Sequence, residues 1–188
     1  MGTKYKAEQY DKIYIEADKY WKHYSESPYL PIYEVAIKLI KTLNVLELGC
    51  GTGQFAEMLF DKFKNINYYG VDFSEQAIKM AKMFAPEFTF EVMDIEKPHV
   101  FDKIYYDTVI LLEVLEHILD ITVLNNIKKG SNIIASVPNY DSQNHLRFFK
   151  TIEEVQKRYY NHVNFDSIEW VKDIEEVRNW IVFSGTIK

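Results

Sequence analysis

The chain has 188 residues, of which 47% are apolar and 27% charged, proportions typical of one globular domain with a buried core. The net charge is −6 and no segment is rich in lysine and arginine, so binding to nucleic acid is not expected. A single cysteine excludes an internal disulfide and any paired-cysteine zinc or redox site, and the sequence lacks an apolar stretch long enough for a signal peptide or a membrane span. We therefore expect a cytoplasmic protein with one domain, residues 1–188.

Tyrosine is concentrated at the front of the chain, where seven of the 14 tyrosines lie within the first 33 residues. Tyr10, Tyr14 and Trp21 belong to an aromatic series with offsets of three and four, the spacing of one helix face. This spacing predicts a helix over residues 4–24. A second helix is expected to begin at Pro28, because proline is tolerated in a first helical turn. Residues 1–42 are thus interpreted as an N-terminal helical cap.

From residue 44 onward, short apolar runs alternate with helical patterns. The runs are expected to be strands because they are almost continuously apolar and are bounded by turn residues. This alternation predicts an α/β fold in which a parallel sheet carries helices on both faces. The expected strands are 45–48, 67–71, 88–92, 108–112, 132–137, 163–170 and 180–187, and the expected helices are 55–64, 75–84, 116–128 and 151–158.

Three alternating glycines, Gly49, Gly51 and Gly53, follow the first predicted strand and precede a helix. Such a turn lets the backbone lie against a ligand beside a helix N-terminus. Gly51 and Gly53, with Ala56, also satisfy the dinucleotide-binding fingerprint, and Asp72 stands where an acidic ribose ligand is expected. The glycine turn alone therefore leaves a nicotinamide cofactor, another nucleoside cofactor and a purely structural turn open.

Four motifs, taken together, resemble those of class I S-adenosylmethionine-dependent methyltransferases in order and spacing. They are Glu47–Gly53, Val71–Ser74, Met93–Ile95 and Leu112–His117. The resemblance covers about residues 43–150. It implies a Rossmann-like three-layer sandwich whose seven-stranded sheet has the order 3-2-1-4-5-7-6 with strand 7 antiparallel. Residues 43–188 would be the catalytic core and residues 1–42 a helical lid.

The resemblance also implies a role for each motif residue toward S-adenosylmethionine and its product S-adenosylhomocysteine. Asp72 would accept from both ribose hydroxyls, because a carboxylate is a strong double acceptor. Phe73 and Ile95 would enclose adenine, Asp94 would accept from its amine, and Glu47 would face the methionine end. The cofactor-binding residues implied are Glu47, Gly49, Cys50, Gly51, Gly53, Asp72, Phe73, Asp94, Ile95 and Glu113.

Glu113, Glu116, His117 and His145 form a second group of chemically active residues. A similar group occurs in ubiquinone-biosynthesis O-methyltransferases and in the metal site of small-RNA 3'-end 2'-O-methyltransferases. Two carboxylates and two imidazoles would suit Mg²⁺, Mn²⁺ or Zn²⁺. His117, His145 and Glu113 are alternatively candidates for acid–base catalysis or acceptor positioning, and helix capping with surface histidines is the third interpretation. We do not expect a metal.

The acceptor is expected to contact the loop after strand 132–137 and the aromatic cap. Asn139, Tyr140, Asn144 and Arg147 could hydrogen-bond a polar acceptor. Tyr10, Tyr14 and Trp21 could line a lid or simply pack on the sheet. The resulting prediction is direct methyl transfer to oxygen or nitrogen of a small molecule. A metal-assisted RNA 3'-end 2'-O-methyltransferase and a non-catalytic S-adenosylmethionine-binding regulatory protein are the alternatives.

Overall fold

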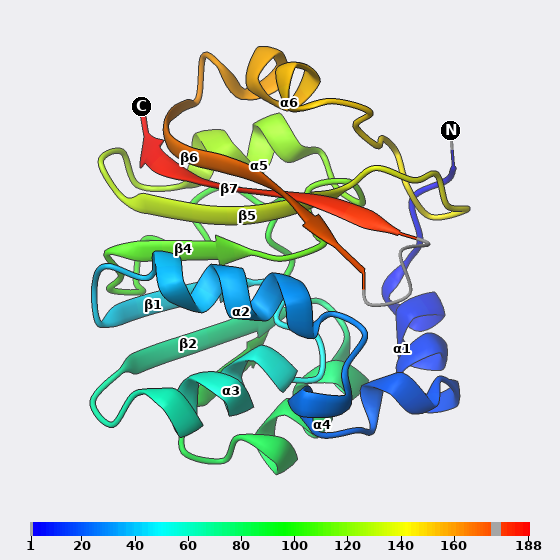
Figure 1. Ribbon diagram of the computed structural model, residues 1–188. Coiled ribbons are helices and arrows are strands. Elements are labelled where there is room, and N and C mark those ends of the chain that lie inside the picture. Colours follow the sequence, from blue (N-terminus) through cyan, green and yellow to red (C-terminus); the bar gives the residue numbers. More distant parts are fainter. Residues whose placement is uncertain (1, 174–177) are drawn as a thin grey trace.

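The computed structural model describes residues 2–173 and 178–188 and contains a seven-stranded sheet of order β3-β2-β1-β4-β5-β7-β6 (Figure 1). The pairs among the first five strands are parallel, and β7 runs antiparallel to β5 and β6. This confirms the expected strand order and the antiparallel strand 7. The strands are β1 (Asn44–Leu48), β2 (Asn67–Asp72), β3 (Thr89–Val92), β4 (Thr108–Leu111), β5 (Asn132–Pro138), β6 (Val163–Lys172) and β7 (Asn179–Ile187).

Helices cover both faces of the sheet and bury two apolar layers. Successive residues of a strand point to opposite faces, so Val45 joins the layer under the helices of one face, while Leu46 and Leu48 join the other. The sheet is therefore apolar on both sides, as a covered parallel sheet requires. The first face carries α2 (Leu30–Leu39), α3 (Gln54–Lys62) and α4 (Glu75–Phe84), and the second carries α5 (Asp120–Asn126) and α6 (Ile152–Tyr159).

The cap lies at the edge of the sheet where the parallel strands end, and α1 (Ala7–Glu16) stands beside this edge in Figure 1. Asp11 attaches α1 to the start of α4, since its Oδ1 accepts from the Ser74 hydroxyl and from the Gln76 amide at 3.2 Å. The first three described residues reach the same edge, where the Gly2 amide donates to the His145 carbonyl at 2.8 Å. The cap is thus bound to the sheet edge at both its first residues and α1.

The helix predicted over residues 4–24 is wrong in extent. It ends at Glu16, and two 3₁₀ turns follow, η1 (Asp18–Tyr20) and η2 (Tyr24–Glu26). A competing contact lies at the break: the Ile15 carbonyl, which would accept from the Lys19 amide in a continued helix, accepts from Trp21 Nε1 at 3.2 Å. After the break, the Gln54 amide nitrogen donates to the Lys19 and Lys22 carbonyls at 2.9 and 2.8 Å and holds the two 3₁₀ turns.

The helix predicted over residues 116–128 is also shorter, since α5 begins at Asp120. Arg147 donates from Nη1 to the Leu115 and Ile118 carbonyls, the latter at 2.8 Å, and holds this segment as a turn. Glu116 and His117 therefore lie in the loop after β4 rather than in a helix. In the described residues, every helix is too short or too polar to cross a bilayer.

Candidate functional site

Two cavities adjoin at the carboxyl ends of β1, β2 and β4. We call them the large cavity, of about 570 Å³, and the small cavity, of about 90 Å³. Their shared wall is formed by Tyr10, Tyr14, Gly49, Glu113 and His117. Ligands of doubly wound sheets bind at this edge. A ligand in one cavity would therefore lie next to a ligand in the other.

The glycine turn lies under the cavities and has the backbone conformation that its sequence predicts. Gly49, Gly51 and Gly53 have φ values of +74°, +53° and +83°, a region that side-chain-bearing residues rarely adopt. A Cβ at Gly49 would lie 2.6 Å from Val114 Cγ2, and one at Gly53 would lie 2.9 Å from the Ala81 backbone. Glycine is thus required here both for the turn and for the close approach of two neighbouring segments.

The small cavity is lined by Asp72, Phe73, Asp94 and Ile95. Asp72 is buried, and its two carboxylate oxygens accept from the Gly51 amide at 3.0 Å and the Ser74 amide at 2.9 Å. Burial raises the pKa of Asp72 to about 6, although these amide donors act in the opposite direction. An acceptor for hydroxyl groups thus stands beside an aromatic ring and an aliphatic side chain, the combination that a nucleoside needs.

Glu47 and Cys50 extend the glycine turn into the large cavity. Glu47 lies at the end of β1 and accepts from the Tyr68 hydroxyl. Burial raises the pKa of Glu47 to about 8, and burial likewise raises the pKa of the Cys50 thiol. At neutral pH, Glu47 is therefore mainly protonated until a cation lies beside it.

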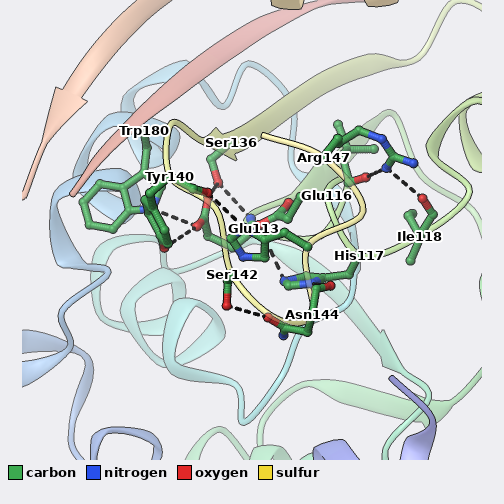
Figure 2. Close-up of polar contacts among 12 residues, drawn as sticks. Glu113, Glu116, His117, Ile118, Ser136, Tyr140, Ser142, Asn144, Arg147 and Trp180 are labelled. Atoms are coloured by element: carbon green, nitrogen blue, oxygen red, sulfur yellow. Dashed lines mark hydrogen bonds and ion pairs between the residues drawn. The ribbon is translucent and has the colours of Figure 1, made fainter. Parts of the chain in front are cut away.

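Glu113 occupies the shared wall in a strained backbone conformation, with a φ of +58°. Figure 2 shows its carboxylate surrounded by donors: Ser136 Oγ at 2.9 Å, Trp180 Nε1 at 2.7 Å and the Tyr140 hydroxyl at 3.5 Å. Its amide also donates to Ser136 Oγ at 2.8 Å. Burial raises the pKa of Glu113 to about 7 despite these donors. Strain of this kind accumulates at functional sites, and here β5 and β7 hold it in place.

Glu116, His117 and His145 lie together, with one candidate ligand atom from each within 4.8 Å of the others. Both carboxylate oxygens of Glu116 are buried without a hydrogen-bond partner in the described residues, and Glu116 Oε1 is 3.6 Å from His117 Nε2. Glu113, by contrast, uses its carboxylate on Ser136 and Trp180. The structure thus brings three of the four predicted metal candidates together and places the fourth beside them in a different network.

The histidine hydrogen bonds determine which ring nitrogens are free. His117 Nδ1 donates to the Asn144 carbonyl at 2.9 Å, and His145 Nδ1 donates to the Tyr140 carbonyl at 3.1 Å. A carbonyl only accepts, so a neutral ring keeps its lone pair on Nε2. Burial lowers the pKa of His117 to about 4 and also lowers the pKa of His145. Burial raises the pKa of Glu116 well above its usual range, which favours the protonated carboxyl next to the imidazole lone pair.

The cap places two of its three predicted lid residues over the cavities. Tyr10 lies between Phe73 and His117, with ring centroids 5.2 and 5.9 Å away, and its hydroxyl accepts from Asn144 Nδ2 at 3.2 Å. Tyr14 is buried next to the glycine turn. Trp21 does not join them: it is 45% exposed and its Nε1 donates to the Ile15 carbonyl at 3.2 Å.

Of the four loop residues predicted to contact an acceptor, Tyr140 and Asn144 line the large cavity. Asn139 pairs with Asn179 through its backbone and its Oδ1. Arg147 binds two backbone carbonyls and lies 3.5 Å from an Asp120 oxygen, so it stabilises the loop before α5. Asn139 and Arg147 therefore stabilise the fold and do not line the large cavity.

Sequence reasoning missed several residues of the large cavity. They are Lys19, Gln54 and Arg178, which line it, and Trp180, which donates to Glu113. Gln54 directly follows Gly53, so its position beside the glycine motif was a usable signal. No signal in the sequence pointed to Lys19, Arg178 or Trp180, because only the folded chain brings the cap and β7 to the glycine turn.

The fold and site define a class of protein, a doubly wound sheet with a small cavity lined by Asp72, Phe73 and Ile95 beside a glycine turn. The family model described as a methyltransferase domain matches residues 20–181. The chain therefore belongs to this family, which confirms the resemblance to class I S-adenosylmethionine-dependent methyltransferases.

Relatives of named function match shorter regions. Malonyl-[acyl-carrier protein] O-methyltransferase of Bacillus cytotoxicus is 37% identical over 83 residues, 43% of this chain and 28% of that protein. Ubiquinone biosynthesis O-methyltransferase of Nitrosomonas europaea is 27% identical over 125 residues, 62% of this chain and 46% of that protein. The matched region thus spans less than half of each curated relative.

A solved structure shares the fold over almost the whole chain. The N-methyltransferase NodS from Bradyrhizobium japonicum, in complex with S-adenosylhomocysteine, has a TM-score of 0.71 at 15% identity and covers 96% of this chain and 98% of that chain. At this identity the similarity is one of fold.

Proposed function

We propose that this protein binds S-adenosylmethionine and transfers its methyl group to a small acceptor molecule. The observation that carries the proposal is the pair of adjoining cavities, which meet at Gly49, Glu113 and His117. The small cavity suits adenosine, and the large cavity has room for a methionine end and an acceptor, since ligand cavities are usually about 300–1,000 Å³. Residues 43–188 would act as the catalytic core and residues 1–42 as its cap.

The cofactor residues follow from the donors and acceptors already described. Asp72 would accept from the ribose hydroxyls, Phe73 and Ile95 would enclose adenine, and Asp94 would accept from the adenine amine. Gly49, Cys50, Gly51 and Gly53 would lie along the methionine end, where a Cβ at Gly49 or Gly53 would disrupt the turn. Glu47 and Glu113 would face its positive charge, and a nearby cation favours their ionised forms.

The bound sulfonium supplies an activated methyl group, so the protein's task is alignment and exclusion of water. The cap excludes water: Tyr10 and Tyr14 cover the junction of the cavities. For a hydroxyl acceptor, His117 Nε2 and His145 Nε2 are the proposed proton acceptors, because each Nδ1 is already a donor. Glu113 and Tyr140 would position the acceptor at the shared wall.

Calorimetry tests the proposal. Wild-type protein should bind S-adenosylhomocysteine in a 1:1 complex and show no binding of NAD⁺ at the same concentrations. Methyl-labelled S-adenosylmethionine should then label one member of a panel of phenols, amines and carboxylic acids. Binding of NAD⁺ without binding of S-adenosylhomocysteine would overturn the proposal, and tight cofactor binding with no labelled acceptor would favour a regulatory role.

A divalent ion held by Glu116, His117 and His145 is a second candidate, favoured by the two unpartnered oxygens of Glu116. We propose that the cluster works without an ion, with Glu116 protonated beside His117. Treatment with EDTA should then leave methyl transfer unchanged, and added Mn²⁺ should not bind in calorimetry. Loss of transfer on EDTA treatment, restored by Mn²⁺ but not in Glu116→Gln, would show that the ion is needed and would revive the RNA-end alternative.

A further inference from the structure

Two positively charged side chains line the large cavity without a carboxylate partner among the described residues. Lys19 comes from η1 in the cap and Arg178 stands just before β7, which begins at the same edge as α1 in Figure 1. Neither takes part in an ion pair with any other residue of ranges 2–173 and 178–188. Surface cations need no partner, but a cation in a cavity loses hydration.

Aromatic rings surround these two cations. Lys19 Nζ donates to the Tyr29 hydroxyl at 2.8 Å and lies 4.8 Å from the ring centroids of both Tyr20 and Tyr29. The Arg178 guanidinium carbon lies 5.5 Å from the ring centroid of Tyr140. Lys19 is thus stabilised by π-faces and a hydroxyl oxygen and Arg178 by a π-face, and none of these neutralises a positive charge. The remaining donor hydrogens are available to a ligand.

The two cations also act on each other. The pKa of Lys19 is lowered, first by burial and then by the charge of Arg178, while Glu113 acts in the opposite direction. Among the acidic residues of the large cavity, burial raises the pKa of Glu47 to about 8, of Glu113 to about 7 and of Glu116 further. Asp141, the other acidic residue of the wall, acts on His145. An anion between the cations would relieve their repulsion.

We infer that Lys19 and Arg178 form an oxyanion subsite, so that the methyl acceptor carries a carboxylate or a phosphate monoester group. This inference rests on the proposed function and names the substrate class of the same cavity. Charge-assisted hydrogen bonds to a planar guanidinium suit both oxyanions. The tyrosine walls suit a flat body between the oxyanion and the shared wall.

The subsite anchors the acceptor and does not supply the methylated atom. An oxyanion between two cations has its lone pairs engaged and is therefore a poor nucleophile. The accepting atom would instead lie toward Glu113 and His117, where the large and small cavities meet. Lys19 and Arg178 are thus specificity-determining residues rather than catalytic ones.

The test measures binding of simple probes to the protein saturated with S-adenosylhomocysteine. Benzoate, phenyl phosphate and the neutral benzamide are titrated by ligand-observed NMR at constant ionic strength. We expect at least one of the two anions to bind at least tenfold more tightly than benzamide, and the better anion identifies the oxyanion. In Lys19→Gln and Arg178→Gln, affinity for that anion should fall at least fivefold, while benzamide binding stays unchanged.

Lys22→Gln is the matched control, because Lys22 is exposed on the same cap segment, and it should leave anion binding unchanged. Benzamide binding as tightly as both anions, or anion binding insensitive to both substitutions, would overturn the inference. The affinity for S-adenosylhomocysteine is measured separately in each variant and should stay within twofold of wild type. If wild type fails to bind S-adenosylhomocysteine, the proposed function fails, and the same titrations without it still test the subsite.

Thermal unfolding separates this role from a structural one. Because Lys19 has no ionic partner in the described residues, Lys19→Gln should leave the unfolding midpoint of the ligand-free protein unchanged or raise it. A lowered midpoint combined with unchanged anion binding would assign Lys19 a packing role and overturn the subsite.

Discussion

The small and large cavities differ in how the chain builds them. The small cavity uses residues at or shortly after the ends of β2 and β3, such as Asp72, Phe73 and Ile95. The large cavity joins the cap, the glycine turn, the loop after β5 and the residue before β7. The motif residues of the proposed cofactor site thus lie at strand ends, whereas the proposed acceptor site depends more on contacts between distant parts of the chain. The cap residues Tyr10 and Tyr14 line both cavities.

The sharpest test of the small cavity is Asp72→Asn. If Asp72 binds the ribose, losing charge-assisted hydrogen bonds of about 1.5–3 kcal/mol each should weaken binding of S-adenosylhomocysteine on the order of 100-fold. Calorimetry measures this, with Asp166→Asn on the exposed side of β6 as the control. Equal affinities in Asp72→Asn and wild type would remove Asp72 from the cofactor site.

Gly49→Ala tests the junction of the cavities. Its φ of +74° and the 2.6 Å approach to Val114 Cγ2 should together cost about 3 kcal/mol of unfolding free energy, from strain and overpacking. Gly130→Ala is the matched control: its φ is +83°, but nothing lies within 4 Å of an added Cβ, so about 1–2 kcal/mol is expected. Urea unfolding measures both. Equal losses would show that the turn alone requires glycine.

Asp11→Ala tests whether the cap serves the large cavity. Loss of the Asp11 contacts with Ser74 and Gln76 should loosen α1 and weaken binding of S-adenosylhomocysteine about fivefold, the equivalent of about 1 kcal/mol. Amide hydrogen exchange in α1 should quicken in the same variant. Asp18→Ala removes an equally charged, exposed residue of the cap and should change neither. Faster exchange with unchanged affinity would make the cap a packing element only.

Glu47 should produce the smallest effect, a proton release. Its pKa of about 8 keeps it protonated at pH 7, and a cofactor ammonium beside it would lower that pKa. Binding should therefore release up to about one proton, and affinity should rise as pH rises from 6 to 8. Calorimetry in buffers of different ionisation enthalpy measures this, and Glu47→Gln should abolish it. A proton release that survives in Glu47→Gln would point to another group.

The sequence predicted most of the proposed cofactor site and little of the proposed acceptor site. The motifs around Gly49, Asp72 and Ile95 lie at strand ends, so their meeting follows from the parallel sheet they predict. Trp21 and Arg147 were misplaced because helical spacing and residue type do not show which backbone carbonyls a distant side chain will occupy. Gln54 holds the turns that follow the cap helix, and Arg147 itself interrupts the predicted start of α5.

The sequence by itself determined the class of this protein. Strand–helix alternation specifies the sheet, and glycines at a strand end specify the glycine turn, because each pattern involves residues that are close together in the chain. Only the tertiary structure decided what faces the acceptor. It shortened the first helix, separated Glu113 from the Glu116, His117 and His145 cluster, and brought Lys19 and Arg178 to one cavity. These outcomes depend on burial and on hydrogen bonds between residues far apart in the chain, and no regular spacing of residues predicts such contacts.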